Sequence, residues 1–265
     1  MDVKVTKIGV ISLGWLGLRL AEQLALRGAK VWGTSRNSEK MTEQSLDSAV
    51  DVVYWNQGDG LSSDLQLKLS TIDLLILNLP PSVFQNGNYA SGLMQFLPFI
   101  SSETNVIFTS STGVYPSNLS DAKEDYEFAN GEMNRLLEAE LALRQACGKR
   151  LTILRLAGLI GEDRHPVQYL VKKAVNENPE GKVNLIHRKD VIQIIDRIIE
   201  HNFWGEILNV CHPDHPSRKS YYTMKAKLYS LRLPKFVEQS KNEDNKIVNC
   251  NKLLNDLGYS SFESL

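Results

Sequence analysis

Short apolar runs alternate with stretches of helical periodicity along the first part of the chain. The runs are rich in Val, Ile and Leu, as buried strands are. Between them, apolar side chains recur every three or four residues, for example at Leu16, Leu20 and Leu24, which predicts one buried helix face. This alternation is typical of an α/β protein with a mainly parallel sheet. The six predicted strands are residues 7–13, 30–34, 50–55, 72–78, 105–109 and 151–155.

The pattern is looser in the second part of the chain. The predicted elements there are helices at residues 167–176 and 191–200 and strands at residues 183–186 and 207–210. The helix at 191–200 carries an apolar stripe of Val and Ile, so one face is expected to be buried. We therefore divide the chain into a domain of residues 1–155 and a smaller lobe of residues 156–265, partly interwoven with it.

The first predicted strand runs directly into the sequence SLGWLG at residues 12–17, and then into a helix. This is the context that a dinucleotide-binding turn requires. Gly14 lets the backbone approach a pyrophosphate, Gly17 lets helix and strand pack closely, and the helix N-terminus offers N–H donors. Ser12 replaces the first glycine of the usual pattern and lacks glycine's freedom at positive φ. The predicted cofactor contacts here are Ser12, Gly14, Trp15, Leu16 and Gly17, and the alternative is a plain strand–helix turn.

The second predicted strand ends at Ser35 and Arg36, and Arg36 lies nineteen residues after Gly17. At this place in such folds an acidic residue binds the ribose 2′-hydroxyl of NAD, whereas an Arg with a nearby hydroxyl accommodates the 2′-phosphate of NADP. We therefore predict NADP as the cofactor. Lys40 either adds positive charge to this site or is a solvated helix lysine.

A stiff turn, Leu79 and Pro80 followed by a second proline, comes after the fourth predicted strand. Open α/β sheets bind ligands outside the carboxyl ends of their strands. We therefore predict that Leu79 and Pro80 border the cofactor.

Six short segments, starting with the turn itself, follow one another along the chain. They are residues 14–17, 34–36, 79–81, 109–115 (TSSTGVY), 154–161 (LRLAGLIG) and 183–190 (VNLIHRKD). On these segments the chain resembles the extended or atypical short-chain dehydrogenases/reductases of the NAD-dependent epimerase/dehydratase superfamily. The resemblance covers nearly the whole chain. It implies a Rossmann-type doubly wound parallel sheet with a small C-terminal substrate lobe.

The same resemblance implies that Ser111 hydrogen-bonds the substrate oxygen beside the nicotinamide. Sugar-dehydrating members carry an acid/base pair at the next two positions, where this chain has Thr112 and Gly113. Neither residue transfers a proton as a carboxylate does, which argues against dehydratase chemistry. The predicted site residues at this strand end are Ser110 for the cofactor and Ser111, Thr112 and Tyr115 for catalysis.

The family's proton donor, a Tyr-x-x-x-Lys pair, is absent from its expected helix. Tyr126 lies in that region, but Asn130 stands where the lysine is needed. Tyr115 is either the acid or a buried ring with a local hydrogen bond. Two matching pairs, Tyr169 with Lys173 and Tyr221 with Lys225, lie in the C-terminal part, away from the segments that the resemblance places at the nicotinamide.

Three other groups have both a functional and a structural interpretation. The segment 211–215 contains Cys, two His and Asp, but no second ligand cluster accompanies it, so we predict no metal site. His187 and Asp190 are expected to cap the following helix and to lock it to the tail. Arg155 could bind an anionic substrate, but an ion pair with a neighbouring acid fits a buried strand end better.

Composition limits the remaining possibilities. The chain has 265 residues, 42% hydrophobic and 23% charged, and 30 Lys and Arg balance 31 Asp and Glu. This near-neutral balance argues against nucleic acid as a partner, no apolar run is long enough for a membrane span, and three widely spaced cysteines fit a reducing cytoplasm.

We expect an NADP-dependent oxidoreductase or epimerase that acts on a small carbonyl or sugar-nucleotide substrate and forms a homodimer. The alternatives are a non-catalytic NADP(H)-binding sensor or regulator that lacks the Tyr-x-x-x-Lys pair, and an interaction scaffold that binds no cofactor.

Overall fold

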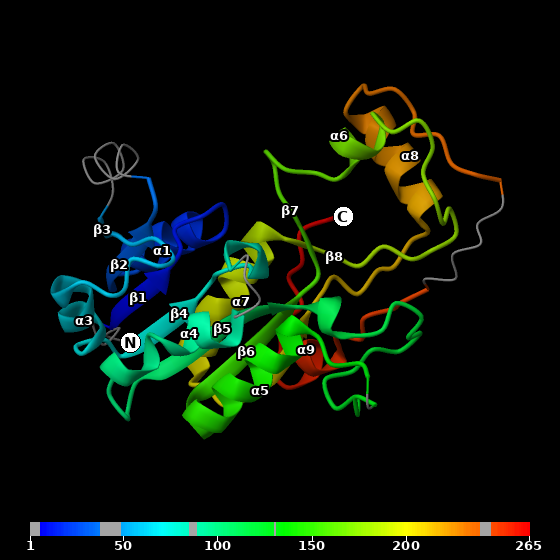
Figure 1. Ribbon diagram of the computed structural model, residues 1–265. Helices are drawn as coiled ribbons and strands as arrows, with labels where there is room; N and C mark the ends of the chain where they lie inside the picture. Colours follow the sequence, from blue (N-terminus) through cyan, green and yellow to red (C-terminus); the bar gives the residue numbers. More distant parts are fainter. Residues whose placement is uncertain (1–5, 38–48, 85–88, 130, 239–244) are drawn as a thin grey trace. The chain divides into compact units, whose positions relative to one another are not determined.

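The computed structural model describes residues 6–37, 49–84, 89–129, 131–238 and 245–265 (Figure 1). Its strands are β1 (Lys7–Ile11), β2 (Lys30–Ser35), β3 (Val50–Tyr54), β4 (Leu74–Leu77), β5 (Asn105–Ser111), β6 (Leu151–Leu156), β7 (Gly158–Ile160), β8 (Leu185–His187) and β9 (Ile207–Val210). Its α-helices are α1 (Gly17–Leu26), α3 (Ser63–Leu69), α4 (Tyr89–Met94), α5 (Arg135–Cys147), α6 (Val167–Leu170), α7 (Arg188–His201), α8 (Arg218–Leu228) and α9 (Asn251–Asn255). Short 3₁₀ turns include η1 (Pro81–Val83) and η3 (Thr112–Val114).

Seven strands form one sheet in the order β3-β2-β1-β4-β5-β6-β9. The pairs β1–β2, β1–β4, β2–β3 and β4–β5 are parallel. The order reverses at β1, where the chain passes from β2 and β3 on one side to β4 on the other, as in doubly wound sheets. The predicted Rossmann-type α/β fold is confirmed, and all six predicted strands of the first part are present.

The chain divides into two compact units. The first comprises Met1–Ser110, Met133–Leu154 and Ile195–Ile207, and the second comprises Ser111–Glu132, Arg155–Ile194 and Leu208–Leu265. Strands β5, β6 and β9 and helix α7 each begin in one unit and end in the other. We describe the two units separately.

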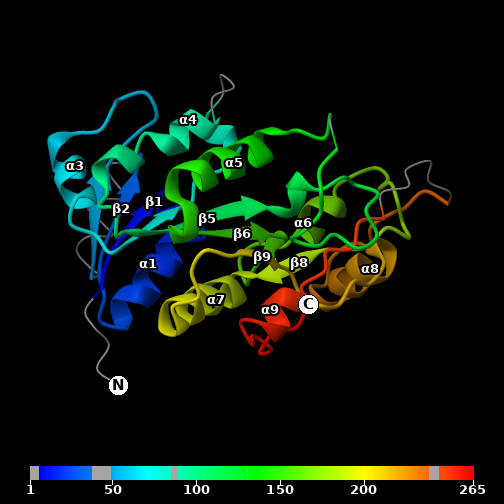
Figure 2. The ribbon, with the colours of Figure 1, turned by 90° about the horizontal axis from the view of Figure 1, so that it is seen from below.

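In the first unit, helices cover both faces of the sheet. Figure 2 shows α4 and α5 on one face and α1 on the other. The strands are almost fully apolar because both faces are covered, and all four residues of β4 are buried. The ion pair between Arg27, at the end of α1, and the buried Asp196 of α7 measures 3.3 Å and ties two helices of this unit together.

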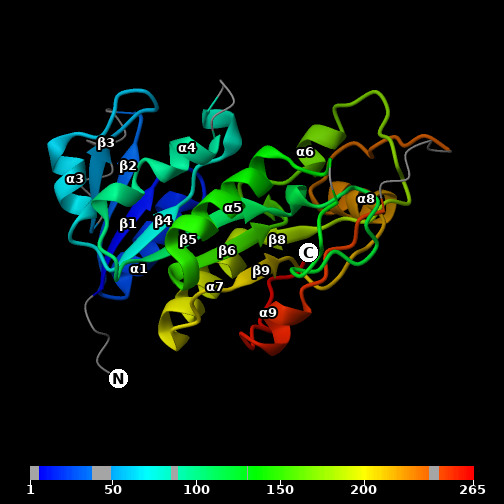
Figure 3. The ribbon, with the colours of Figure 1, turned by 60° about the horizontal axis from the view of Figure 1, so that its bottom comes forward.

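In the second unit, β7 and β8 form a two-stranded parallel sheet. Helices α6 and α8 lie side by side (Figures 1 and 3) and share a core with β7 and β8 that includes Val167, Leu170 and Tyr221. The helix predicted at residues 167–176 is too long, because α6 ends at Leu170. The buried Asn176 explains the early end, since its side-chain amide donates to the carbonyl of Leu170 and its backbone pairs with residues 235–237.

No helix in the described ranges is long and apolar enough to cross a bilayer.

Candidate functional site

The turn between β1 and α1 begins with a residue in the left-handed region. Ser12 has φ of 82°, the conformation for which the usual motif has glycine. Two hydrogen bonds hold it there: its N–H donates to the Thr34 hydroxyl at 2.8 Å, and its carbonyl accepts from the Asn78 side-chain amide at 3.3 Å. Ser12 therefore replaces the first glycine without changing the course of the turn.

The two remaining glycines have different surroundings. A Cβ on Gly17 would overlap the Ser12 carbonyl oxygen, so helix α1 starts too close to β1 for any other residue. A Cβ on Gly14 would meet only the Ser12 hydroxyl, at 3.7 Å, so this side of the turn is open. Helical hydrogen bonding starts with Leu18 donating to Gly14, while Leu16 is buried and Trp15 is half-buried. The first turn of α1 contains no acidic residue that would repel an anion.

The end of β2 lies beside this turn. The N–H of Leu13 donates to the carbonyl of Thr34 at 2.7 Å, so β2 is tied to the turn one residue before Ser35. Ser35 is half-buried and its hydroxyl accepts from the N–H of Asn37, whereas Arg36 is exposed. In the part of the chain that the structure describes, Arg36 forms no ion pair. Lys40 lies outside the described residues.

The end of β4 supplies a residue that the sequence analysis missed. Asn78 bridges two strand ends, since its amide nitrogen donates to Ser12 and its carbonyl oxygen accepts from the Thr109 hydroxyl at 3.0 Å. A polar residue directly after an apolar strand was the available signal. Leu79 is buried and its carbonyl accepts from the Tyr89 hydroxyl at 2.7 Å, and Pro80 is exposed at the start of η1.

Ser110 is held by a buried acid in the first unit. Its hydroxyl donates to Glu140 of α5 at 2.6 Å, and both residues are buried. A hydrogen bond this short fixes the rotamer of the serine. The structure thus places the Ser110 hydroxyl toward α5, and its predicted role at the cofactor stays a prediction.

The second unit begins at Ser111, the N-cap of η3. Its hydroxyl accepts from the N–H of Gly113 at 3.1 Å, and its side chain remains half-buried. Thr112 is buried, and its carbonyl accepts from the Lys246 ammonium group at 2.9 Å. Lys246, far along the chain, also donates to the Tyr115 carbonyl at 3.4 Å. The turn that carries Ser111 is therefore clamped by a lysine that no local pattern could have predicted.

Tyr115 is the centre of a buried polar network. Its hydroxyl donates to the Asn209 side-chain oxygen at 2.8 Å and accepts from the Arg155 guanidinium at 2.6 Å. The guanidinium also lies over the rings of Tyr115 and Phe128, at 4.9 Å and 5.7 Å from their centroids. Burial, partly opposed by Arg155, raises the pKa of Tyr115 to about 12. A phenol in this state is a poor acid or base near pH 7.

The hydroxyl of Tyr126 is also hydrogen-bonded. Its hydroxyl lies 3.1 Å from both carboxylate oxygens of Glu132, and its pKa is raised by burial and by that carboxylate. Its ring packs edge-on against Phe128 with centroids 5.0 Å apart. Neither tyrosine of this region therefore offers a free hydroxyl to a substrate.

The two Tyr-x-x-x-Lys pairs of the tail differ in burial. Tyr169 is 65% exposed and only its ring contacts Lys173. Tyr221 is buried, and its hydroxyl lies 2.9 Å from the Nε2 of the buried His165. Because Nδ1 of His165 accepts from Val167, the Nε2 hydrogen is the one that points at Tyr221. Lys225 packs over the Tyr221 ring, so this pair belongs to the packing of α6 against α8.

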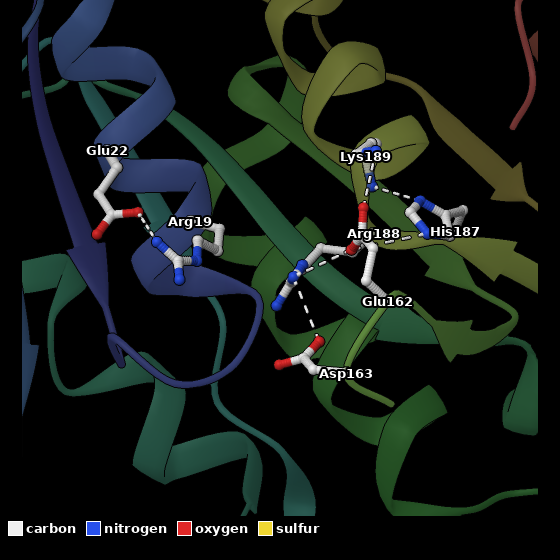
Figure 4. Close-up of polar contacts among 7 residues, drawn as sticks. All are labelled: Arg19, Glu22, Glu162, Asp163, His187, Arg188 and Lys189. Atoms are coloured by element: carbon white, nitrogen blue, oxygen red, sulfur yellow. Dashed lines mark hydrogen bonds and ion pairs between the residues drawn. The ribbon is translucent and has the colours of Figure 1, made fainter. Parts of the chain in front are cut away.

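A charged cluster joins the ends of β7 and β8 (Figure 4). Glu162 accepts from Lys189 at 2.7 Å and from Arg188 at 3.4 Å. The hydrogen bond from Lys189, helped by a backbone N–H, lowers the pKa of the Glu162 carboxyl group to about 2. Asp163 pairs with the same guanidinium nitrogen of Arg188 at 3.3 Å. The figure also draws the Arg19–Glu22 pair of α1, at 2.8 Å.

His187 and Asp190 have the structural role expected from the sequence. The Nδ1 of His187 accepts from the N–H of Lys189 at 3.2 Å in the first turn of α7. The buried Asp190 accepts from the Tyr259 hydroxyl and from the N–H of Glu263. Together they cap α7 and hold the C-terminal segment against it.

In the described ranges no group of three or more His, Cys, Asp or Glu side chains could hold a metal ion. Within segment 211–215, the His212 Nδ1 accepts from the N–H of Asp214, and the His215 ring bonds the Val183 carbonyl. The segment is thus a hydrogen-bonded turn.

Comparison with known proteins identifies the family. No protein-family profile matches the chain. Protein YeeZ of Escherichia coli strain K12 is 32% identical over 263 residues, which cover 96% of this chain and 94% of YeeZ. The chain belongs to the YeeZ family. YeeZ of Escherichia coli O157:H7 matches with the same values.

Several solved structures share the fold of this chain. A short-chain dehydrogenase/reductase superfamily protein from Agrobacterium tumefaciens with bound NAD has a TM-score of 0.76 at 14% identity, covering 97% of this chain and 93% of that one. A UDP-N-acetylglucosamine 4-epimerase from Bacillus cereus has a TM-score of 0.68 at 16% identity, covering 96% and 93%. MoeE5 in complex with UDP-glucose and NAD has a TM-score of 0.73 at 16% identity, covering 98% and 94%. These likenesses confirm the predicted Rossmann-type fold, which the chain shares with proteins of the predicted superfamily.

Proposed function

We propose that this chain is an NADP-dependent oxidoreductase or epimerase of the atypical short-chain dehydrogenase/reductase type. The observation that carries the proposal is the turn after β1. Ser12 takes the positive φ of the missing glycine, and Gly17 leaves no room for a side chain. A turn that kept only packing glycines would not need the first position in this conformation. The turn therefore fits a pyrophosphate next to the N-terminus of α1.

The end of β2 supports NADP over NAD. Arg36 is exposed and without an ion pair in the described ranges, and the half-buried Ser35 precedes it. An arginine that no carboxylate occupies is available for a 2′-phosphate. Gly14, Trp15, Leu16, Leu79, Pro80 and Ser110 complete the proposed contacts. When bound, this cofactor supplies hydride transfer to or from a carbon atom of the substrate.

Ser111 is proposed to orient the substrate oxygen, because its side chain is half-buried and, in the described ranges, its hydroxyl only accepts, from the Gly113 N–H. Its hydrogen is therefore free to be donated. Thr112 is proposed to assist Ser111, and Lys246 holds the turn that carries both residues through the backbone carbonyl of Thr112. The proposed substrate is a small carbonyl compound or a sugar nucleotide, and the second class is supported by the UDP-glucose of MoeE5.

A cofactor titration tests the proposal. Calorimetric titration of the chain with NADPH and, separately, NADH is expected to show at least about tenfold tighter binding of NADPH, or ~1.4 kcal/mol. Arg36→Ala should remove this preference and leave NADH binding unchanged, because only the 2′-phosphate is lost as a partner. Arg144→Ala, which removes an exposed arginine of α5, is the matched control. Equal losses for both cofactors would refute the NADP assignment.

A non-catalytic NADP(H) sensor is the second candidate. The specific observation in its favour is that both tyrosines near Ser111 are engaged, Tyr115 with Arg155 and Asn209 and Tyr126 with Glu132. A panel of carbonyl compounds and sugar nucleotides separates the two candidates. Turnover of NADPH that Ser111→Ala abolishes identifies an enzyme, whereas tight binding without turnover of any panel member favours the sensor.

Three further assignments belong to the proposal. Residues 1–155 bind the cofactor and residues 156–265 bind the substrate. A cytoplasmic location is supported by the free thiols of Cys147, Cys211 and Cys250, all of which are buried. The chain is also proposed to be a homodimer, because closed two-fold pairs are the commonest oligomers.

A further inference from the structure

The part of the chain that contains α8 is basic, although the whole chain has a net charge of −1. Between residues 216 and 237 there are six Lys or Arg and no Asp or Glu. Lys219 and Lys227 are exposed and form no ion pair in the described part of the chain. Unpaired surface cations concentrated on one helix create a local positive potential.

This face is also hollowed. A groove of about 540 Å³ runs along α8, and it is lined by Glu180, Ser217, Lys219, Ser220, Thr223, Met224 and Lys227. Apolar side chains lie at and beyond the end of the helix: Met224 is 49% exposed, Leu228 66% and Leu233 47%. We call the groove with these side chains the α8 surface. Its exposed Met and Leu side chains lie beside charged and polar ones, as the apolar centre of a protein interface lies beside its polar rim.

The second unit also carries a surface of opposite charge. The segment 121–132, here called the acidic segment, contains five Asp or Glu and a single Lys. Asp125 and Glu127 are exposed and form no ion pair in the described ranges. Between and beside them lie the half-buried rings of Tyr126 and Phe128. The segment thus offers the α8 surface both anions and apolar contacts.

The two surfaces carry opposite charge. The α8 surface has two exposed lysines, Lys219 and Lys227, and one carboxylate, Glu180. In the acidic segment Lys123 is ion-paired with Asp121 at 2.8 Å, and Asp125 and Glu127 are the exposed anions without an ion pair in the described ranges. A flat anionic bilayer would not fill the groove, and a nucleic acid backbone would have no partner for the exposed leucines. From these observations we propose that the α8 surface of one copy of this chain binds the acidic segment of a second copy. In a two-fold pair the contact forms twice.

This inference rests on the homodimer of the proposed function and names its interface. Sedimentation velocity of the full-length chain is expected to show a dimer that dissociates as NaCl rises from about 50 mM to about 500 mM, since salt screens exposed charges. Lys219→Glu with Lys227→Glu should raise the dimer dissociation constant at least about tenfold, or ~1.4 kcal/mol. Asp125→Lys with Glu127→Lys should do the same.

An equimolar mixture of the two double variants provides the decisive test of the interface. Each charge-reversed surface then meets the charge-reversed partner surface, so the mixture should dimerise more tightly than either variant alone. Lys30→Glu with Lys149→Glu reverses two exposed charges of the first unit and should leave the dimer intact. Circular dichroism shows whether each variant is folded, and rescue in the mixture itself requires folded partners.

The outcomes separate this inference from the homodimer on which it rests. A monomer at every concentration overturns both. A dimer that neither double variant weakens, or whose variants fail to pair when mixed, overturns the interface and keeps the homodimer. Species larger than a dimer would refute the proposal that the chain forms a closed two-fold dimer.

Discussion

A single residue, Ser12, stores backbone strain in the proposed cofactor turn. Its φ of 82° is costly for any residue with a Cβ. We expect Ser12→Gly to raise the free energy of unfolding by about 0.5–1 kcal/mol, the left-handed penalty less the added freedom of the unfolded chain. Urea unfolding measures this change. Ser12→Ala keeps the strain and removes only the hydroxyl, so it should not stabilise; an equal gain in both variants would contradict the explanation.

The hydroxyl of Tyr115 satisfies two buried side chains, Arg155 and Asn209. Tyr115→Phe keeps the ring over which the guanidinium lies and leaves part of that buried cation without an acceptor. We expect a loss of about 1–3 kcal/mol in the free energy of unfolding, measured by denaturant titration. Tyr126→Phe, whose partner Glu132 is more exposed, should cost less than half of this. Equal costs would show that the Arg155 contact adds nothing.

At the scale of residues, the sequence predicted where the candidate site residues lie better than which side chains they contact. The departure at Ser12 and the place of Arg36 at the end of β2 followed from motif spacing. Asn78 and Lys246 did not, because their partners lie far away in the chain. For the same reason the sequence could not decide between an acid and a structural ring for Tyr115.

At the scale of elements, His165 couples α6 to α8 in a way that depends on pH. Burial, helped by the nearby Lys225, lowers the pKa of His165 to about 4, whereas a free histidine titrates near 6.5. Between these values the unfolded chain binds a proton that the folded chain does not. The free energy of unfolding should therefore fall as the pH drops from about 6.5 to about 4, by on the order of 2 kcal/mol.

The test compares wild type with His165→Gln, which can still donate to Tyr221 but does not titrate. The difference in unfolding free energy between the two should shrink as the pH falls through this window. Asp196 titrates in the opposite sense, since burial raises its pKa to about 6, so only the difference between variant and wild type is informative. A difference that is constant with pH would rule out the His165 contribution.

The sequence predicted strands correctly where apolar residues form a continuous run. The strands of the main sheet are buried on both faces, so their sequences needed no alternation to be recognised. β7 was missed because it has three residues and gains its partner, β8, from a distant segment. The predicted length of α6 was wrong because Asn176 pairs with residues 235–237, a contact that no local pattern contains.

At the scale of the whole molecule, the two units share strands and a helix, so we expect them to unfold together. Strands β5, β6 and β9 and helix α7 each contribute residues to both units, and unfolding one unit would break elements of the other. All four tryptophans, Trp15, Trp32, Trp55 and Trp204, lie in the first unit. Tryptophan fluorescence therefore reports on one unit, whereas far-UV circular dichroism reports on both.

The two signals should give coincident thermal transitions. NADPH at about one hundred times its dissociation constant should stabilise the folded chain by ~2.7 kcal/mol, and it should move both transitions upward by the same amount although the proposed turn lies in the first unit. Arg36→Ala at the same NADPH concentration is the control and should show a smaller shift. If NADPH moved the fluorescence transition and left part of the dichroism transition behind, the second unit would be an independently folding domain, and the shared elements would not couple the proposed cofactor site to the substrate lobe.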